Sequence, residues 1–536
     1  MFSDKIIALR TSKGLSQERF AERLGMSRQA VQRWENGTAF PDLENLMRIA
    51  KTFGVSLDWL GDLSSVQSAD ALRRQDALVP SYDDLDLWES YAPDILTDLD
   101  EFRDEGHDVS DIADVARAVS AMKNGETKEA LADTLFRHMY GSPIREDYGY
   151  DEPDDLHEIR LRRPEGVKLA FSPTPDDGAL REKIVGAWRG RVAGCLLGKP
   201  VECIMTDELH DMLKWSGNFP LRRYITSTDV ADPRYSSNRF TFDRPWQCWG
   251  DTLTDGFPGD DDTNYPVIAL RIVDEYGLNF TSGNVARWWK DNISIRYVAT
   301  AERVALRNIM AGYMPPESAK YKNPFREWIG AQIRGDYFGY INPGDPETAA
   351  GMAWRDARIS HTKNGIYGEM FSAAMVAGAF LLDDPAEIVR CGLSQIPATS
   401  RLYERIAGVL EDFRNGVGEE EFIKGFFKRN DEFRKHDAVH TIANAELVAA
   451  SLLYCGGDYG KSICFAVQNG FDTDCNGATV GSIVGAMRGA SGIPEEWTSP
   501  LKDKVHTPFY SGGVITTDDM ADAVMKHIAM KRGECR

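Results

Sequence analysis

The sequence lacks the features that would place the chain in a membrane or a secretory compartment. It contains no run of about 18 uncharged apolar residues, and the longest candidate, Met370–Leu382, is short enough to be a buried helix. The first residues lack the apolar stretch of a signal peptide, so we expect a cytoplasmic protein with no membrane partner. Eight cysteines are scattered without a C-x-x-C pair, which favours reduced thiols over a disulfide framework or a zinc site.

Three common catalytic motifs are also missing. Gly460-Lys461-Ser462 ends like a phosphate-binding P-loop, but Cys455 stands where that motif requires glycine. The chain has neither the H-E-x-x-H motif of metalloproteases nor the G-x-S-x-G motif of serine hydrolases. Strand signals are few as well, so we predict an all-α protein, and a length of 536 residues indicates two or three domains.

Negative charge is concentrated in one part of the chain. The net charge is −21 overall, but residues 1–62 carry nine basic and eight acidic side chains, whereas residues 63–180 carry 12 basic and 28 acidic ones. Because the whole protein repels phosphate, any contact with DNA must come from a local face of residues 1–62.

Residues 1–62 are predicted to form five short helices. Ser16 can cap a helix over Gln17–Leu24 that ends at Gly25, and Ser27 can cap a second helix over Arg28–Glu35. This pair, joined by a tight turn, has the dimensions of a helix-turn-helix. Apolar residues at helical spacing indicate the other helices, namely Ile6, Ile7, Leu9 and Leu15, then Leu43, Leu46, Met47, Ile49 and Ala50, and finally the segment Val55–Leu60.

This first segment resembles the Cro/CI (XRE-type) family of DNA-binding domains. The residues that carry the resemblance are Leu15-Ser16-Gln17, Ala21, Leu24-Gly25, Ser27, Val31, Trp34-Glu35-Asn36-Gly37, Pro41 and Leu46. The resemblance implies that the second helix of the pair enters the major groove, and that the protein binds two half-sites as a homodimer. The DNA-binding residues would be Arg28, Gln29, Gln32 and Arg33 at base edges and Gln17 near a phosphate. A small helical bundle used for protein contacts is the alternative.

No motif identifies the function of the acidic segment 63–180. Ser64–Asp76 is predicted as a linker, Asp111–Met122 and Lys128–Met139 as helices, and Ser142–Pro175 as a stretch that contains loops. We therefore predict a small acidic helical subdomain. Its acidity is either an ordinary solvated surface or a means of keeping the rest of the protein off DNA, and composition does not separate the two.

Two acidic clusters in the remaining segment, 181–536, point to a metal site. Asp260-Asp261-Asp262 is one cluster, and Asp472-Thr473-Asp474 is the other. Adjacent carboxylates raise one another's pKa unless a positive charge holds them, and oxygen ligands of this kind suit Mg²⁺, Mn²⁺ or Ca²⁺. We predict that the two clusters meet in space around a metal centre. Helix capping by aspartate is the simpler alternative, but one cap explains only one aspartate.

The second cluster, Asp472-x-Asp474-x-Asn476-Gly477, matches the first half of an EF-hand calcium loop. It is not such a loop, because Ile483 stands at the twelfth position, where glutamate is needed. Instead, glycine recurs every fourth residue, at Gly477, Gly481, Gly485 and Gly489. Each glycine costs about 1 kcal/mol of helix propensity relative to alanine. Such a repeated cost along one helix face indicates that another backbone passes very close.

Segment 181–536 resembles the ADP-ribosylglycohydrolases, a family of all-α hydrolases. Four stretches carry the resemblance, and the two acidic ones are specific in this order and at this separation. The stretches are Gly186-x₃-Gly190-x₃-Gly194-x₃-Gly198-x-Pro200-x-Glu202, Asp260-Asp261-Asp262-Thr263, Ser360-His361 and Asp472-Thr473-Asp474-Cys475-Asn476. The resemblance implies a large all-helical domain that cleaves ADP-ribosyl bonds.

The same resemblance implies a centre of two Mg²⁺ or Mn²⁺ ions and a set of site residues. The metal ligands would be Asp260, Asp261, Asp262, Asp472, Asp474 and Cys475. The catalytic residues would be Glu202 and Asp261, and the substrate-binding residues would be His361, Arg334, Gly330 and Asp336. A surface turn for Glu202 and a structural role for His361 are the alternatives.

Three positions depart from the pattern of that family. It usually has Thr or Ser where Asp260 stands, Thr where Cys475 stands, and Asp in the opening helix where Cys195 stands. Because a thiol is a poor ligand for a hard ion, these changes shift the metal preference toward Mn²⁺ or weaken one site.

Two functions are compatible with these features. One is a metal-dependent enzyme that hydrolyses an ADP-ribosyl N- or O-glycosidic bond on a protein or a small molecule, fused to a sequence-specific DNA-binding domain. The other is a transcription regulator whose large domain senses ADP-ribose or a related nucleotide without turnover. The three predicted parts are a DNA-binding domain over 1–62, the acidic subdomain over 63–180 and the glycohydrolase-like domain over 181–536.

Overall fold

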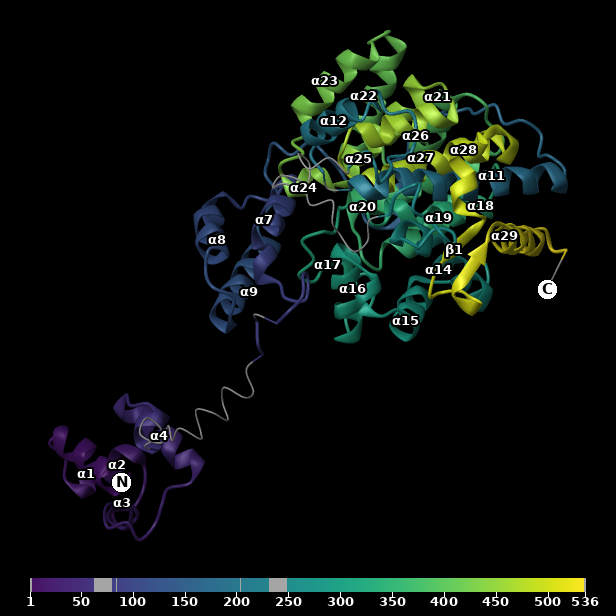
Figure 1. Ribbon diagram of the computed structural model, residues 1–536. Coiled ribbons are helices and arrows are strands. Elements are labelled where there is room, and N and C mark those ends of the chain that lie inside the picture. Colours follow the sequence, from purple (N-terminus) through teal and green to yellow (C-terminus); the bar gives the residue numbers. More distant parts are fainter. Residues whose placement is uncertain (1, 62–79, 83, 203, 231–247, 535–536) are drawn as a thin grey trace. The chain divides into compact units, whose positions relative to one another are not determined.

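The computed structural model of the chain describes residues 2–61, 80–82, 84–202, 204–230 and 248–534. Met1–Asp84 forms one compact unit, and Leu85–Arg536 forms a second one. Helices make up nearly all of the regular structure (Figure 1), which confirms the predicted all-α fold. The linker predicted over Ser64–Asp76 lies outside the described residues.

The N-terminal unit contains the five predicted helices. They are α1 (Phe2–Ser12), α2 (Gln17–Leu24), α3 (Arg28–Glu35), α4 (Leu43–Phe53) and α5 (Leu57–Gly61). At the start of α2, Oγ of Ser16 accepts a hydrogen bond from the N–H of Arg19, and Gly25 ends the helix with φ 64°. Oγ of Ser27 likewise accepts from the N–H of Ala30 at the start of α3. The local cap signals therefore place both helices of the helix-turn-helix.

The apolar stripe predicted for α4 is wrong in part. Ile49 and Phe53 are buried, but Leu43 is 68% exposed and Met47 is 56% exposed. The small core of the unit contacts only one face of α4, and these two side chains lie on another face. Phe40, just before the helix, is also 61% exposed.

The acidic subdomain is helical and packs against the large domain. Its helices are α7 (Ile95–Asp104), α8 (Ala113–Ser120), α9 (Glu126–Gly141) and α10 (Leu156–Leu161). Helices α7 to α9 enclose a small apolar core of their own. Arg326 of the large domain pairs with Asp98 at 2.6 Å and with Glu105 at 2.8 Å, and all three side chains are buried. Neither explanation offered for the acidity covers these carboxylates, because they bind the subdomain to the large domain.

Over its described residues, the large domain is a helical assembly with one short antiparallel hairpin near its end. The hairpin pairs β1 (Lys504–His506) with β2 (Val514–Thr516). The helices are α11 (Asp177–Gly198), the 3₁₀ turn η3 (Lys199–Val201), α12 (Thr206–Trp215), α14 (Asp261–Tyr276), α15 (Ser282–Asn292), α16 (Thr300–Met310), α17 (Glu317–Lys320), α18 (Asp336–Tyr340), α19 (Pro346–Ala357), α20 (Lys363–Ala379), α21 (Pro385–Leu393), α22 (Arg401–Arg414), α23 (Glu419–Arg429), α24 (Lys435–Ala438), α25 (Thr441–Tyr454), α26 (Tyr459–Gln468), α27 (Thr473–Arg488), α28 (Glu495–Thr498) and α29 (Thr517–Arg532).

The glycine stripe of α27 faces a second glycine stripe on α11, and the two helices lie side by side (Figure 1). A Cβ atom added to Gly190 would lie 2.2 Å from the carbonyl oxygen of Gly481. One added to Gly194 would lie 1.9 Å from the carbonyl oxygen of Gly477. The prediction that another backbone passes very close is therefore confirmed.

This antiparallel pairing places the end of α11 beside the start of α27. Oγ1 of Thr473 donates a hydrogen bond to the carbonyl oxygen of Gly198 at 2.9 Å. The turn η3 then leads from Gly198 to Glu202, so two motifs that are far apart in the sequence meet at one end of the helix pair. Helices α20 and α25, which are almost entirely buried, pack against α27.

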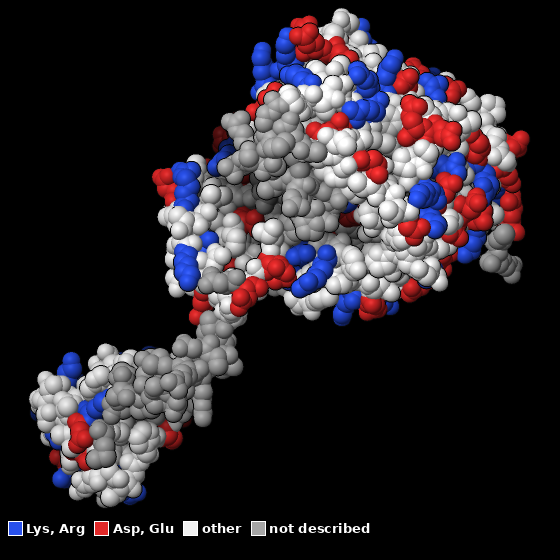
Figure 2. Space-filling model, viewed as in Figure 1, with Lys and Arg blue, Asp and Glu red and all other residues white. Residues whose placement is uncertain are grey.

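The surface of the large domain carries charges of both signs. Basic and acidic side chains are interspersed over the face visible in Figure 2. No helix within the described ranges is both long and apolar enough to cross a membrane.

Candidate metal centre

The first acidic cluster begins helix α14. The N–H of Asp260 donates to Oγ1 of Thr263 at 3.0 Å, and the N–H of Asp262 donates to Oδ1 of Asp261 at 3.0 Å. Capping contacts of this kind were the alternative to a metal site. They leave Oδ2 of the fully buried Asp262 without a hydrogen-bond partner among the described residues.

The second acidic cluster begins helix α27, and Asn444 of α25 holds it in place. Oδ1 of Asn444 accepts hydrogen bonds from the N–H of Asp472 at 3.1 Å and from Nδ2 of Asn476 at 2.7 Å. Asp474 is 3% exposed, and its Oδ1 has no partner in the part of the chain that the structure describes. Nothing around Asn444 in the sequence marks it as part of this site.

The two clusters meet, because ligand atoms of Asp262, Asp474 and Cys475 all lie within 4.8 Å of one another. Burial and the nearby carboxylate of Asp260 raise the pKa of Asp474 to about 6. Burial and the same Asp260 carboxylate also raise the pKa of Asp261 well above its ordinary value. These carboxylates are buried, their neighbours make ionisation costly, and Asp262 and Asp474 each keep an oxygen without a hydrogen-bond partner among the described residues. Such a set of oxygen donors fits a divalent cation that prefers oxygen ligands.

A lysine that the sequence analysis missed lies at the first cluster. Nζ of Lys199 pairs with Oδ2 of Asp260, and both side chains are less than a tenth exposed. Burial raises the pKa of Asp260, but the Lys199 ammonium and the hydrogen bonds that Asp260 receives from Lys199 and its chain neighbours together outweigh burial and lower it. Asp260 adds a negative charge where the family usually has Thr or Ser, and the ammonium of Lys199 balances that charge. The only sign in the sequence is that Lys199 comes three residues before Glu202.

Arg191 of α11 is a second charged residue that the sequence analysis missed. It is fully buried, and it donates from Nη2 to Oδ1 of Asp262 at 3.2 Å and from Nε to the carbonyl oxygen of Asp262 at 2.7 Å. Its Nη1 donates to Oδ2 of Asp336 at 2.7 Å. Asp336, which was predicted to bind substrate, is therefore a buried partner of Arg191, and this contact gives no support to a substrate role.

The other predicted substrate residues are buried as well. Arg334 donates from Nε to Asp356 at 2.6 Å and from Nη1 to Glu302 at 2.8 Å, and it is 2% exposed. A Cβ atom on Gly330 would meet the same Glu302 carboxylate at 2.2 Å. Burial and the Arg334 charge lower the pKa of His361 well below its ordinary value, so its ring is neutral. These contacts favour structural roles, and substrate binding by these residues stays a prediction.

Glu202 lies close to the second cluster. It follows η3 and is partly buried. The pKa of Asp472 is raised by burial, then by Asp474 and then by the carboxylate of Glu202. The predicted catalytic carboxylate is thus near enough to Asp472 to act on it electrostatically.

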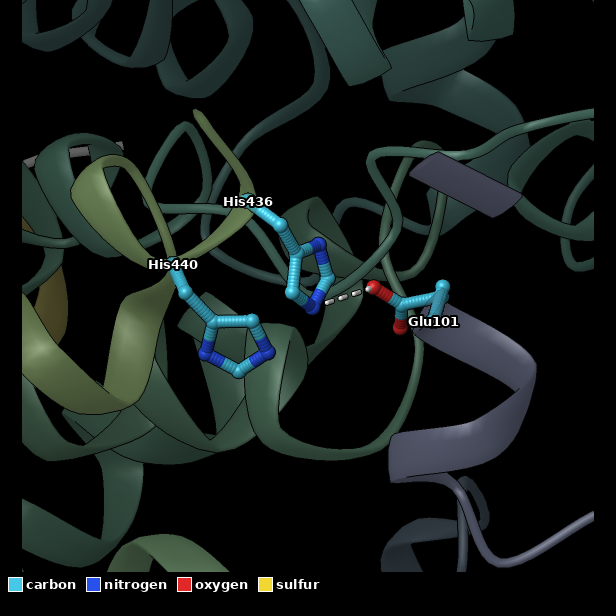
Figure 3. A group of neighbouring side chains, drawn as sticks. All are labelled: Glu101, His436 and His440. Carbon is cyan, nitrogen blue, oxygen red and sulfur yellow. Dashed lines mark ion pairs between the residues drawn. The ribbon is translucent and has the colours of Figure 1, made fainter. Parts of the chain in front are cut away.

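A separate group of potential metal ligands lies where the acidic subdomain meets the large domain. Glu101 of α7 lies beside His436 and His440 (Figure 3), and ligand atoms of the three residues lie within 4.8 Å of one another. However, Nε1 of Trp328 donates to Nδ1 of His436 at 3.2 Å, and the N–H of Ile442 donates to Nδ1 of His440 at 3.2 Å. A ring nitrogen that accepts a hydrogen bond carries no proton, so the N–H proton of each ring lies on Nε2, and Nε2 then has no free lone pair for a metal ion. These hydrogen bonds argue against a metal ion here.

The helix-turn-helix leaves the predicted DNA-reading side chains of α3 on the surface. Val31 and Trp34 of this helix are buried in the core of the unit. The exposed residues are Arg28, Gln29, Gln32 and Arg33. Nε2 of Gln17 donates to Oε2 of Glu35 at 2.7 Å, which fixes the start of α2 against the end of α3.

The fold and these sites together define an all-helical protein with a helix-turn-helix unit and a buried acidic centre in a separate helical domain. A family model described as ADP-ribosylglycohydrolase matches residues 176–534, and one described as helix-turn-helix matches residues 6–60. The chain belongs to the ADP-ribosylglycohydrolase family and carries a helix-turn-helix DNA-binding domain before it.

Similar proteins share one part of the chain or the other. The HTH-type transcriptional activator BcrR of Enterococcus faecalis is 46% identical over 59 residues, which are 11% of this chain and 29% of that protein. The prophage-derived uncharacterized HTH-type transcriptional regulator YonR of Bacillus subtilis is 35% identical over 98 residues, 18% of this chain and 90% of that protein. An uncharacterized protein of Archaeoglobus fulgidus is 24% identical over 252 residues, 46% of this chain and 75% of that protein.

Proposed function

We propose that the large domain hydrolyses an ADP-ribosyl N- or O-glycosidic bond with the help of two Mg²⁺ or Mn²⁺ ions. The observation that carries the proposal is the meeting of Asp262 and Asp474, each with a carboxylate oxygen that has no partner among the described residues. An oxygen ligand set beside Glu202 suits a reaction at the anomeric carbon of ribose. Release of free ADP-ribose from ADP-ribosylated arginine, serine or a small molecule is the test.

The chain's own residues would hold the ions and keep their ligands in place. The proposed ligands are Asp260, Asp261, Asp262, Asp472, Asp474 and the softer thiol of Cys475. When bound, the ions supply positive charge that orients ribose hydroxyls and lowers the pKa of a water molecule. Arg191 fixes Asp262, and Asn444 fixes the backbone of Asp472, so both clusters keep their geometry.

Glu202 is the proposed general acid–base group, with Asp261 as a second catalytic carboxylate. Cleavage gives the anomeric carbon oxocarbenium character, and a carboxylate beside it can take a proton from the attacking water or deliver one to the leaving atom. The pairing of α11 with α27 sets the position of Glu202, because η3 begins where α11 ends. Burial keeps the pKa of Asp261 high, which favours a proton-holding role in the ion-free state.

A regulator that senses ADP-ribose without turnover is the second candidate. Two observations favour it. The ammonium of Lys199 already neutralises Asp260, and a thiol stands at Cys475 among the predicted ligands. Either feature would weaken one ion site. Binding of ADP-ribose that changes the affinity for DNA, without release of any product, would distinguish this function from catalysis.

We propose that α3 reads DNA in the major groove. Replacing both Gln32 and Arg33 with alanine is expected to weaken operator binding by at least tenfold, because each lost base contact costs about 1–3 kcal/mol. The operator would be selected from random DNA with the full-length chain, and affinities measured by gel shift. Lys51→Ala on α4 is the control, since Lys51 is exposed but lies outside the helix pair. Unchanged affinity in the double variant would favour a protein-contact role for the bundle.

We propose that the exposed apolar face of the N-terminal unit joins two copies into a homodimer. Phe40, Leu43 and Met47 are all more than half exposed, and Leu43 and Met47 lie one helical turn apart. Helix-turn-helix domains bind two half-sites as dimers, and apolar faces of this kind mark contact surfaces. The double variant Leu43→Ser/Met47→Ser is expected to sediment as a monomer. Val115→Ser, on another exposed apolar residue, should stay dimeric, and a dimeric double variant refutes the proposed face.

A further inference from the structure

A cavity lined by arginines lies between the acidic subdomain and the large domain. Its volume is about 580 Å³, which is within the range of small-molecule sites. The arginines that line it are Arg103, Arg145, Arg401, Arg405, Arg429 and Arg434. The lining carboxylates are fewer, namely Asp104, Asp147, Glu404 and Asp437. The lining arginines therefore outnumber the lining carboxylates in a chain whose net charge is −21.

Two of these arginines share a single buried carboxylate. Nη1 of Arg405 donates to Oε2 of Glu446 at 2.8 Å, and Nη2 of Arg429 pairs with Oε1 of the same residue. The side chain of Glu446 has no exposed surface, and Asn430 also bonds to it. The two guanidinium groups are therefore held in fixed positions, and together with Glu446 they keep one excess positive charge.

The same two arginines have hydrogen-bond donors to spare. Nε and Nη2 of Arg405, and Nε and Nη1 of Arg429, donate to no residue within the described ranges. Both side chains remain partly exposed, at 29% and 38%. Fixed guanidinium groups with unused donors are the arrangement that binds phosphate with several hydrogen bonds.

We propose that this cavity binds a phosphorylated small molecule, with the phosphate group between Arg405 and Arg429. The site is distinct from the acidic clusters, none of whose aspartates lines the cavity. The two sites are nevertheless neighbours. Ile442 and Ala443 at the start of α25 line the cavity, and Asn444, the next residue, bonds to the backbone of Asp472.

Calorimetric titration of the metal-free full-length chain tests the proposal. AMP and ribose 5-phosphate are the probes, and adenosine is the matched ligand without phosphate. We expect both phosphate esters to bind and adenosine not to bind. The variant Arg405→Gln/Arg429→Gln is expected to bind the esters at least about tenfold more weakly. Hydrogen bonds between a guanidinium group and a phosphate are charge-assisted, and each of them contributes strongly to the binding affinity.

Two controls keep the result specific to this cavity. Arg414→Gln changes an exposed arginine on the same helix as Arg405 and should bind AMP like the wild type. Asp474→Asn should also bind AMP like the wild type, so a failure of the proposed hydrolysis would leave this result unaffected. If the Arg405→Gln/Arg429→Gln variant does not fold, AMP binding is measured on the triple variant that also carries Glu446→Gln. The triple variant no longer buries the Glu446 carboxylate without its arginine partners. Binding of adenosine as tight as that of AMP, no binding of either ester, or unchanged binding in the folded arginine variant would overturn the proposal.

Discussion

Replacing Asp474 with asparagine is expected to reduce the release of ADP-ribose by roughly a thousandfold or more. The loss of a metal ligand removes several kcal/mol of transition-state stabilisation, and each 1.36 kcal/mol is about a factor of ten in rate. Asparagine keeps the shape of this buried side chain and removes its charge. The measurement is steady-state release of ADP-ribose from an ADP-ribosylated peptide in Mn²⁺ or Mg²⁺, with the wild-type chain beside the variant.

Asp291→Asn is the matched control, because Asp291 is exposed on α15 and is not part of either acidic cluster. The control should keep full activity. Equal turnover by Asp474→Asn and the wild type would contradict the proposed centre. A wild-type chain that binds ADP-ribose but releases none from any ADP-ribosylated substrate would favour the sensor instead.

Replacing Gly194 with alanine is expected to lower the free energy of unfolding by about 3 kcal/mol or more. The added Cβ atom would lie 1.9 Å from the carbonyl oxygen of Gly477, and backbone atoms of two long buried helices move apart only at high cost. The separation would also disturb the end of α11, where Glu202 follows. Urea unfolding followed by circular dichroism measures the change.

The same substitution at Gly408 is expected to change the free energy of unfolding in the opposite direction. Gly408 lies inside helix α22, and a Cβ atom there would meet nothing within 4 Å. Alanine is the better helix former, so the variant should be more stable by about 1 kcal/mol. If Gly194→Ala were as stable as Gly408→Ala, the close contact of α11 and α27 would be refuted.

Local signals in the sequence predicted most of the helix-turn-helix. Ser16 and Ser27 act on backbone N–H groups only three residues away, so their capping role can be inferred without knowing the fold. The glycine repeat was informative for a different reason. Its cost recurs at helical spacing, which indicates a close neighbour, although only the structure identifies that neighbour as α11.

The sequence did not indicate which charges meet across the fold. Lys199 reaches Asp260, and Arg191 reaches Asp262 and Asp336, over separations that no local pattern records. The sequence also did not indicate which of the predicted site and core side chains are buried. Arg334 was predicted to bind substrate, but Asp356 and Glu302, which lie 22 and 32 residues away in the sequence, pair with it in the interior. Leu43 and Met47 are the opposite case, because they were assigned to the apolar stripe of a helix but are exposed. An apolar pattern at helical spacing does not say which face of the helix the small core will cover.

The number of Mn²⁺ ions bound per chain tests the central claim most directly. Equilibrium dialysis of the full-length wild type, with free Mn²⁺ measured by electron paramagnetic resonance, is predicted to give two ions per chain. Asp474→Asn is predicted to lose at least one of them, whereas Asp291→Asn should lose none. A wild-type chain that binds no Mn²⁺ or Mg²⁺, or an Asp474→Asn variant that binds as many ions as the wild type, would contradict a metal centre formed by the two acidic clusters.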